Sequence, residues 1–360
     1  LTLTPFMFQL QFEDQVFKSL ADFQSKQKGL PDFVQEALDF CSAWIEGKNE
    51  FIQQTSGSTG TPKKIQITRN QMESSALATG NFFQIKPDSQ LLCCLNTAYI
   101  AGKMMLVRAM EWNCPIRLVA PSSNPLEGLE ENFDFVAMVP LQVETSISNP
   151  KSLKKLQKIK HLIIGGAPIS FSLLKTLADL RLKAWQTYGM TETVSHIALA
   201  KIDTSELIYE VLPQVEIGQD ERGALWVKSE MSQNLKVQTN DLVALISDTS
   251  FQWLGRADFV INSGGVKIFP EILENKSESI IHSIFPGCRF FYFGEKDNKL
   301  GEKVVLILET EKDMEKSALL MEQLKQTLNR YECPKSIYFC PKFSLTETGK
   351  INRKATFEKL

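Results

Sequence analysis

Residues 161–170 read HLIIGGAPIS, a short apolar run that ends at two glycines. Three similar runs precede it: LLCCL at 91–95, IRLVA at 116–120 and FVAMVP at 135–140. Stretches of helical character separate them. Short apolar runs that end at Gly or Pro and are joined by helices are typical of buried parallel strands with crossover helices. The sequence therefore predicts an α/β fold.

The pattern changes in the second half of the chain. Residues 216–229 and 242–256 alternate as antiparallel strands do, with turns expected at Gly223 and Asp248. Residues 257–360 return to a mixture of helices and strands, which predicts a compact β-α-β lobe.

Chain length gives the domain organisation. Domains of about 150 residues are usual, so 360 residues predict two of them. We place the N-terminal domain at residues 1–256 and the small C-terminal domain at 257–360. Within the first, residues 1–50 carry apolar residues at helical spacing and predict one or two amphipathic helices.

Composition excludes several classes of protein. Lys plus Arg number 40 and Asp plus Glu 42, so the net charge of −2 does not favour a nucleic-acid partner. Seven cysteines without a C-x-x-C pair and only three histidines argue against a zinc site and fit a reducing cytoplasm. No stretch reaches the roughly 18 apolar residues of a spanning helix, so we expect neither secretion nor integral membrane association.

A polar loop follows the first helical region. Residues 55–60 read TSGSTG, and such a run lets backbone N–H and hydroxyl groups converge on phosphate oxygens, with Lys63 nearby to neutralise charge. An ordinary flexible surface loop is an equal alternative. A Walker A loop is disfavoured, because Gly60 is followed by Thr61 and Pro62 rather than by Lys and Ser or Thr.

A second polar segment, QTYGMTET at 186–193, ends with the carboxylate of Glu192 and two further hydroxyls. Oxygen ligands of this kind suit Mg²⁺ bound together with nucleotide phosphates. The alternative is that Thr191 or Thr193 simply caps a helix. Further along come four charged residues, each of which alone is compatible with a solvated surface: Asp241, Arg256, Asp258 and Lys350.

Taken in order, these segments resemble five signatures of the acyl-adenylate-forming enzymes, the superfamily of acyl- and aryl-CoA synthetases, adenylation domains and luciferases. The resemblance covers residues 55–354. It implies a large N-terminal domain with mixed and parallel sheets flanked by helices, a distorted β-barrel-like subdomain, and a small mobile α+β C-terminal domain. It also implies an enzyme that uses ATP and Mg²⁺ to activate a carboxylic acid as acyl-AMP and then transfers it to coenzyme A.

The resemblance implies nucleotide-binding roles for individual residues. Thr191 would contact the α-phosphate and Glu192 would bind Mg²⁺. The remaining nucleotide contacts would come from Thr55, Ser56, Gly57, Ser58, Thr59, Gly60 and Lys63 at the phosphates, Gly165, Gly166, Ala167, Tyr188 and Gly189 at adenine, and Asp241 and Arg256 at the ribose.

The family's two-step chemistry implies further roles in the C-terminal domain. Asp258 matches the hinge about which that domain turns. Gly264 and Gly265 match a loop that faces the site during thioester formation, and Lys350 matches the lysine that reaches the acyl carboxylate and the α-phosphate during adenylation.

Within the superfamily, residues 95–110, LNTAYIAGKMMLVRAM, are similar to a segment of the o-succinylbenzoate-CoA ligases of menaquinone biosynthesis, with Tyr99 in place of a histidine. We therefore expect o-succinylbenzoate as the acid. Its second carboxylate needs a cation, for which Lys103 and Arg108 are candidates, although both also fit an exposed helix face. His196 is a further substrate-site candidate and also fits a polar residue at the pocket floor.

Other functions stay open at this point. One is another aryl- or acyl-CoA ligase, or an adenylation domain that loads a carrier protein. Another is a non-catalytic relic of the fold, which has no physical need for the ordered set Thr191, Glu192, Asp241, Arg256 and Lys350.

Overall fold

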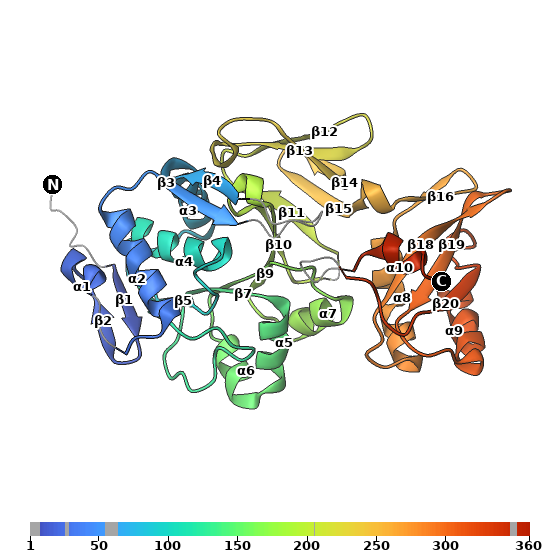
Figure 1. The fold of residues 1–360 in the computed structure, drawn as a ribbon, viewed down its shortest axis with the longest axis horizontal. Coiled ribbons are helices and arrows are strands. Elements are labelled where there is room, and N and C mark those ends of the chain that lie inside the picture. Colours follow the sequence, from blue (N-terminus) through green and yellow to red (C-terminus); the bar gives the residue numbers. More distant parts are fainter. Residues whose placement is uncertain (1–7, 26–28, 55–63, 205, 346–350) are drawn as a thin grey trace.

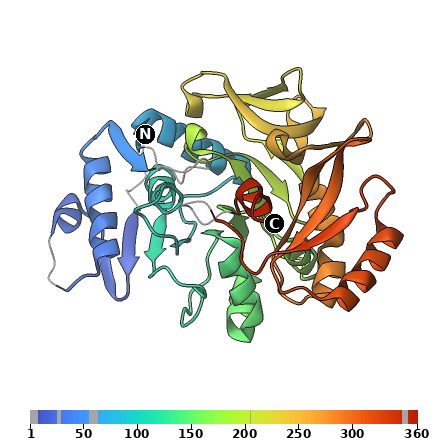
Figure 2. The same ribbon diagram turned by 45° about the vertical axis from the view of Figure 1, so that its right-hand side comes forward.

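The computed structural model describes residues 8–25, 29–54, 64–204, 206–345 and 351–360. A large part with one long sheet is followed by a smaller lobe at the C-terminal end (Figure 1). The lobe adjoins the large part through helix α8 (Pro270–Ile284), which contacts strand β15 (Ser250–Arg256) (Figure 2).

The long sheet contains both predicted kinds of strand. Its thirteen strands in the described residues are, in order across the sheet, β2 (Gln15–Phe17), β1 (Gln9–Phe12), β6 (Pro115–Leu118), β5 (Leu91–Cys93), β7 (Phe135–Met138), β8 (His161–Ile164), β9 (Ala184–Gly189), β10 (His196–Lys201), β11 (Ile208–Val211), β15, β14 (Val237–Ser247), β13 (Ala224–Lys228) and β12 (Glu216–Gln219). Neighbours from β1 to β9 pair in parallel. From β9 to β12 the pairs are antiparallel. The predicted α/β class is confirmed.

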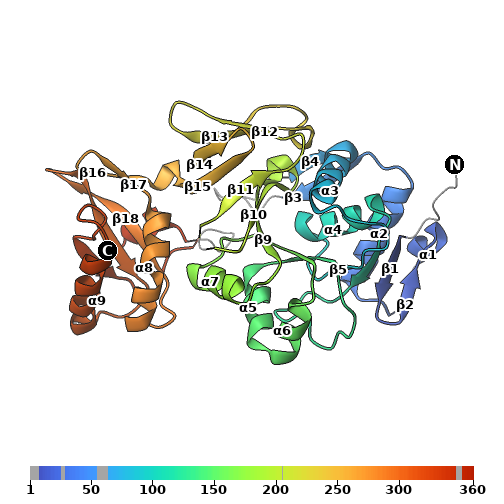
Figure 3. The same ribbon diagram turned by 180° about the vertical axis from the view of Figure 1, so that it is seen from behind.

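Helices cover both faces of the parallel strands. Successive side chains of a strand point to opposite faces, and here the side chains on both faces are apolar, so each face needs a cover. In β7, Phe135 and Ala137 join one apolar cluster, whereas Val136 and Met138 join the other. The first cluster is covered by α2 (Asp32–Ile45), α3 (Arg69–Phe83) and α4 (Ile100–Glu111). The second is covered by α5 (Pro140–Ser148), α6 (Pro150–Leu156) and α7 (Phe171–Asp179) (Figure 3).

The first 50 residues differ in part from the prediction. Helices α1 (Leu20–Gln24) and α2 lie where they were expected, but β1 and β2 form a hairpin at the edge of the sheet. In β1 the side chains of Leu10 and Phe12 are buried, whereas those of Gln9 and Gln11 are only partly buried. This alternation is typical of a strand, but it covers only four residues, and the helical spacing of the residues that follow dominated the prediction.

The antiparallel strands were expected to form a barrel-like subdomain. In the described ranges, strands β10 to β15 continue the long sheet. Within these ranges the last strand, β12, pairs with β13 alone, so these strands do not close into a barrel. A separate hairpin of β3 (Glu50–Gln54) and β4 (Lys64–Thr68) flanks the predicted phosphate loop.

The C-terminal lobe has its own sheet and core. Its elements are β16 (Ile261–Ser263), β17 (Val266–Ile268), α8, β18 (Phe290–Asp297), β19 (Gly301–Leu308), α9 (Met314–Thr327), β20 (Ser336–Phe339) and α10 (Arg353–Phe357). The crossover from β19 through α9 to the parallel β20 is the predicted β-α-β unit. Buried apolar residues of the lobe's core begin at Ile261, and those of the large part's core end at Phe251. The domain boundary after Arg256 stays a prediction. No helix in the described ranges combines the length and apolar character needed to span a bilayer.

Candidate active site

Three predicted ribose and adenine residues meet at the end of β9. The Tyr188 hydroxyl donates a hydrogen bond of 2.7 Å to Oδ2 of Asp241, and Nη1 of Arg256 lies 3.6 Å from Oδ1 of the same carboxylate. Asp241 and Arg256 are cross-strand partners of β14 and β15, so sheet register brings them together. The Asp241 backbone N–H also donates to Oγ1 of Thr239 at 3.0 Å.

The surroundings of Tyr188 keep its phenol protonated, and this sets the direction of that hydrogen bond. Its ring makes edge contacts with Tyr209 and Phe251, at centroid distances of 5.8 and 5.2 Å. Burial, together with the negative charge of Asp241, raises the pKa of Tyr188 far above its ordinary value. The phenol therefore stays neutral and donates, while the carboxylate keeps acceptor capacity that suits the hydroxyls of a sugar.

The predicted hinge residue is joined to this cluster. Nη2 of Arg256 donates to Oδ2 of Asp258 at 3.0 Å, and Nδ2 of Asn240 donates to the same carboxylate. Asp258 lies in the short helix η3 (Ala257–Phe259), directly after β15. Arg256 therefore links a carboxylate on the sheet to the first residues after it.

The glycines after β8 allow a close approach of backbone at the carboxyl edge of the parallel strands. A Cβ on Gly165 would overlap Oγ1 of Thr187 on β9, and Gly166 has a φ of +81°. Open α/β sheets bind ligands at the carboxyl ends of their strands, at the point where the strand order reverses. In this sheet the order reverses at β5, because β6 and β7 lie on opposite sides of it. The segment with Gly165, Gly166 and Ala167 is thus placed where a flat ligand can meet the backbone.

The predicted phosphate and metal residues follow β9 in the short helix η1 (Thr191–Thr193). Glu192 is exposed and, in the described part of the chain, makes no ion pair. The described residues contain no group of three or more His, Cys, Asp or Glu side chains that could hold a metal ion. A single free carboxylate still fits Mg²⁺, which is usually bound by one or two carboxylates together with phosphates.

Two substrate-site candidates lie buried behind η1. Arg108 is 2% exposed and His196 6% exposed, and Nη2 of Arg108 donates to Nδ1 of His196 at 3.4 Å. Burial lowers the pKa of Arg108 to about 10, so it remains a cation at neutral pH. Burial and the Arg108 charge lower the pKa of His196 well below its ordinary value. The alternative that Arg108 lies on an exposed helix face is therefore wrong.

The other two substrate-site candidates lie at the start of α4. Tyr99 is 64% exposed, and Nζ of Lys103 donates to Oε1 of Gln53 at 3.0 Å. Lys103 borders an open groove of about 510 Å³ that also has Phe40 and Phe51 in its wall. Burial lowers the pKa of Lys103.

The remaining predicted residues are elsewhere. Gly264 and Gly265 form the turn between β16 and β17 in the C-terminal lobe, where the Gly264 N–H donates to the Leu300 carbonyl. The predicted residues that lie outside the described residues are Thr55, Ser56, Gly57, Ser58, Thr59, Gly60, Lys63 and Lys350.

Sequence reasoning missed two carboxylates at the junction with the lobe. Oε2 of Glu278 accepts a hydrogen bond of 3.1 Å from the Ser172 N–H at the start of α7. Glu271 packs against Gly255, where a Cβ would lie 2.6 Å from its Oε2. Gly255 has a φ of +146°, so a glycine just before Arg256 was a usable signal of close approach.

The fold is that of an α/β enzyme, and the predicted nucleotide residues Gly165, Tyr188, Asp241 and Arg256 lie at one end of its sheet. The chain belongs to the AMP-binding enzyme family, whose sequence profile matches residues 23–218.

Similar proteins agree with this assignment. The chain is 25% identical over 332 residues to the 2-succinylbenzoate–CoA ligase of Enterococcus faecalis, covering 83% of this chain and 67% of that protein. It is 24% identical to the enzyme of the same name from Lactococcus lactis, covering 98% and 84%.

Solved structures show the same fold. An acyl-CoA synthetase (AMP-forming)/AMP-acid ligase II-like protein from Dyadobacter fermentans is 40% identical, with a TM-score of 0.64 over 94% of this chain and 97% of that one. The o-succinylbenzoate-CoA synthetase of Bacillus subtilis, in complex with its acyl-adenylate intermediate, is 22% identical with a TM-score of 0.69, over 84% and 68%. The second comparison supports the fold alone.

Proposed function

We propose that this enzyme is an AMP-forming acid–CoA ligase whose acid is o-succinylbenzoate. The observation that carries the proposal is the contact of Tyr188, Asp241 and Arg256 at the sheet edge, directly before the helix that carries Thr191 and Glu192. Adenylation requires residues that bind the ribose of ATP close to residues that bind its phosphates and Mg²⁺. The relatives named as 2-succinylbenzoate–CoA ligases support the choice of acid.

In the first half-reaction, a carboxylate oxygen of the acid attacks the α-phosphorus of ATP and pyrophosphate leaves. Two anions come together, so the site must supply positive charge and oriented donors. We assign the Thr191 hydroxyl and the Lys350 ammonium to the α-phosphate, and residues 55–60 to the leaving pyrophosphate. Mg²⁺, held by Glu192 and the phosphates, would neutralise phosphate charge when bound.

In the second half-reaction, the thiol of coenzyme A releases its proton to solvent and its sulfur attacks the acyl carbon. The C–S bond forms, the bond from the acyl carbon to the phosphate-linked oxygen breaks, and AMP leaves. The carboxylate oxygen that formed the anhydride stays on AMP. This step requires that Lys350 withdraw and that the thiol gain access. We assign both changes to a rotation of residues 257–360 about Asp258, with Gly264 and Gly265 then facing the site.

The acid has a second carboxylate that does not react. We assign Lys103 to it, because this ammonium group borders a groove with an aromatic wall, whereas Arg108 is enclosed by protein. Tyr99 lies on the same side of the N-terminus of α4, one helical turn before Lys103.

Release of pyrophosphate tests the proposal. We would measure it with ATP, Mg²⁺ and, in turn, o-succinylbenzoate, benzoate, a fatty acid and an amino acid. The expected result is a kcat/KM for o-succinylbenzoate at least 100-fold above the others. A preference for benzoate or a fatty acid would keep the ligase class and overturn the substrate. An amino acid preference would favour a carrier-loading adenylation domain, and no release with any acid would favour a relic of the fold.

A further inference from the structure

The segment that carries Thr191 and Glu192 ends in a strained turn. Val194 has φ +65° and ψ −52°, and the Ser195 N–H donates to the Thr193 carbonyl at 2.7 Å. These values define a γ-turn of the rare positive-φ type, which is costly for a β-branched residue. Such a turn persists only where its surroundings hold it.

Ser195 and Thr193 hold each other across this turn. Besides the bond between their backbones, Oγ1 of Thr193 lies 3.0 Å from the carbonyl oxygens of both Met190 and Ser195 and shares its single hydroxyl proton between them. Thr193 is fully buried. A displacement of Ser195 is therefore transmitted through Thr193 to the backbone on which Thr191 and Glu192 sit.

Side chains of α3 and α4 fix Ser195 from behind. Its Oγ forms a hydrogen bond of 2.9 Å with Oγ of Ser75 and accepts one of 3.1 Å from Nη2 of Arg108. The same Nη2 donates to His196, whose other ring nitrogen lies 3.1 Å from Oγ1 of Thr79. Because Thr79 donates its hydroxyl proton to the Ser75 carbonyl, the histidine must donate from Nε2 and accept at Nδ1.

Arg108 has no acidic partner in the described ranges. Its other contacts are the Met105 sulfur at 3.7 Å and the ring of Phe135, and its buried Nε has no hydrogen-bond partner. Burial of a guanidinium without an acidic partner carries a desolvation penalty, so Arg108 is not expected to stabilise the core. Its contacts converge instead on Ser195, the last residue of the γ-turn, and on His196, directly after it.

We propose that Arg108 is a positioning residue for adenylation: through Ser195 and His196 it holds the Val194 γ-turn, and so presents Thr191 and Glu192 to the nucleotide. This role rests on the proposed function and replaces direct recognition of the acid by Arg108. The Ser195 hydroxyl is the link, so its loss uncouples Arg108 from the turn without removing the charge.

The test uses the full-length chain and begins with Mg·ATP binding, measured by calorimetry without an acid. Ser195→Ala and Arg108→Lys are expected to weaken binding of Mg·ATP at least 5-fold. With the acid present, kcat of adenylation should fall at least 10-fold while KM for the acid stays within 2-fold. Thioester formation from supplied acyl-adenylate should stay within 3-fold.

Two further variants separate positioning from general destabilisation. Glycine adopts positive φ without strain, so Val194→Gly in the Ser195→Ala background should restore at least a third of the lost adenylation. Arg117→Lys is the matched control, because Arg117 is also an arginine whose buried Nε has no hydrogen-bond partner, and it lies on β6, four strands away from β9. It should leave Mg·ATP binding unchanged.

Three results would overturn the inference. The first is unchanged Mg·ATP binding in both Ser195→Ala and Arg108→Lys. The second is a rise in KM for the acid with unchanged Mg·ATP binding, which would make Arg108 a substrate contact. The third is an equal loss in both half-reactions. An inactive wild-type enzyme would refute the proposed function, while the binding measurement would still decide the role of Arg108.

Discussion

The Glu278 carboxylate of α8 accepts a hydrogen bond from the Ser172 N–H of α7, and this bond joins the C-terminal lobe to the large part of the molecule. The acceptor lies at a helix N-terminus, where a negative charge is favourable by about 0.3–1 kcal/mol. A rotation of the lobe must break it. We therefore predict that Glu278→Gln shifts the ratio of the two half-reaction rates by up to about 5-fold, measured by quenched flow for each half-reaction separately.

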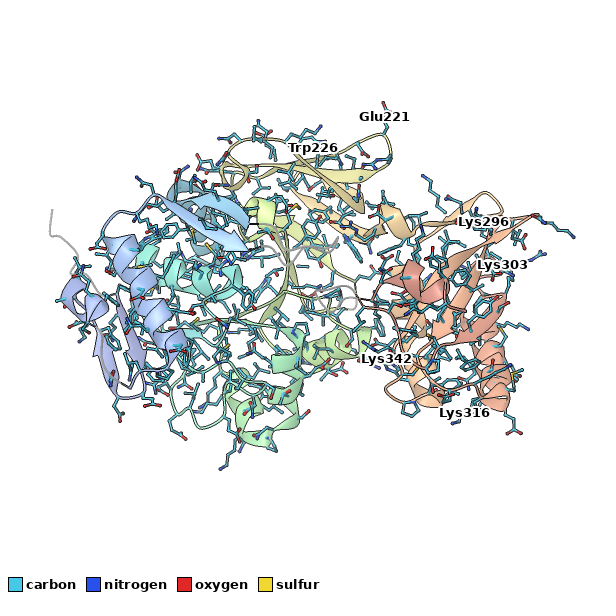
Figure 4. All side chains as sticks on the ribbon, in the orientation of Figure 1. Glu221, Trp226, Lys296, Lys303, Lys316 and Lys342 are labelled. Atoms are coloured by element: carbon cyan, nitrogen blue, oxygen red, sulfur yellow. The ribbon has the colours of Figure 1, made fainter. Side chains whose placement is uncertain are left out.

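The control for this variant lies on the same lobe. Glu295 pairs with Lys303 at 3.1 Å, and Lys303 lies on the outer side of the lobe (Figure 4). Glu295→Gln should leave the ratio unchanged. If both variants change it equally, the junction contact has no special role.

The hydrogen bond from Tyr188 to Asp241 predicts a binding defect. Tyr188→Phe removes a donor to a mostly buried carboxylate and should cost about 1.5–3 kcal/mol of interaction. Part of that loss falls on nucleotide binding, so we expect KM for ATP to rise about 5- to 20-fold with little change in KM for the acid. An unchanged KM for ATP in steady-state assays would remove Tyr188 from the nucleotide site.

Because Gly165 lies close to Thr187, we predict that Gly165→Ala creates a steric clash that Thr187→Ala relieves. Gly165→Ala places a methyl group against Oγ1 of Thr187 and should lower the free energy of unfolding by about 1–3 kcal/mol. The double variant Gly165→Ala/Thr187→Ala removes that oxygen and should recover at least half of the loss in urea denaturation. Additive losses would show that the two residues do not touch.

Glu274 predicts a pH dependence of stability. Burial raises the pKa of Glu274 to about 7, although the ion pair with Arg353 at 2.8 Å acts to lower it. Between pH 4.5 and 7 the folded state then holds a proton that the unfolded state has lost. Stability should therefore fall as pH rises through this window, by up to about 3 kcal/mol.

The difference in unfolding free energy between the wild type and Glu274→Gln isolates this contribution, measured by urea denaturation at pH 5 and pH 8. Glu309→Gln is a control whose difference from the wild type should not change between pH 5 and pH 8, because the hydrogen bond from Arg289 lowers the pKa of Glu309. That contribution is lost only as pH falls below about 4.5. A wild-type advantage that grows from pH 5 to pH 8 would contradict the prediction for Glu274.

Lys103 predicts selectivity for a dicarboxylate. Lys103→Met keeps much of the side-chain volume and removes the charge that we assign to the unreacted carboxylate. KM for o-succinylbenzoate should rise at least 10-fold and KM for benzoate less than 2-fold, measured by pyrophosphate release. Equal effects on both acids would mean that Lys103 supports the site without reading the second charge.

The sequence predicted the sheet where its signal was local. The buried run FVAM becomes a central strand, and turns at Gly223 and Asp248 join the expected antiparallel strands. The β1–β2 hairpin was missed because its strands have only four and three residues, too few for a clear alternation. The pairing of β1 with β6 was missed because it joins residues about 100 positions apart, and no local pattern records such a partner.

The site was predictable where residue types are chemically distinctive. Tyr188, Asp241 and Arg256 were expected to bind the same nucleotide. Sheet register pairs Asp241 with Arg256, and a side-chain hydrogen bond joins Tyr188 to Asp241. The burial of Arg108 could not be foreseen, because the helix that carries it is apolar on more than one side and the partner Ser195 follows a turn that no spacing rule predicts. Glu278 depends on how two helices distant in sequence pack together.

The most direct measurement of the proposed chemistry follows one oxygen atom. We would supply o-succinylbenzoate with ¹⁸O in its carboxyl groups, together with ATP, Mg²⁺ and coenzyme A, and examine the released AMP by mass spectrometry. If the carboxylate attacks the α-phosphorus and the thiol then attacks the acyl carbon, each AMP carries one ¹⁸O atom. Unlabelled AMP, or formation of ADP in its place, would contradict the account.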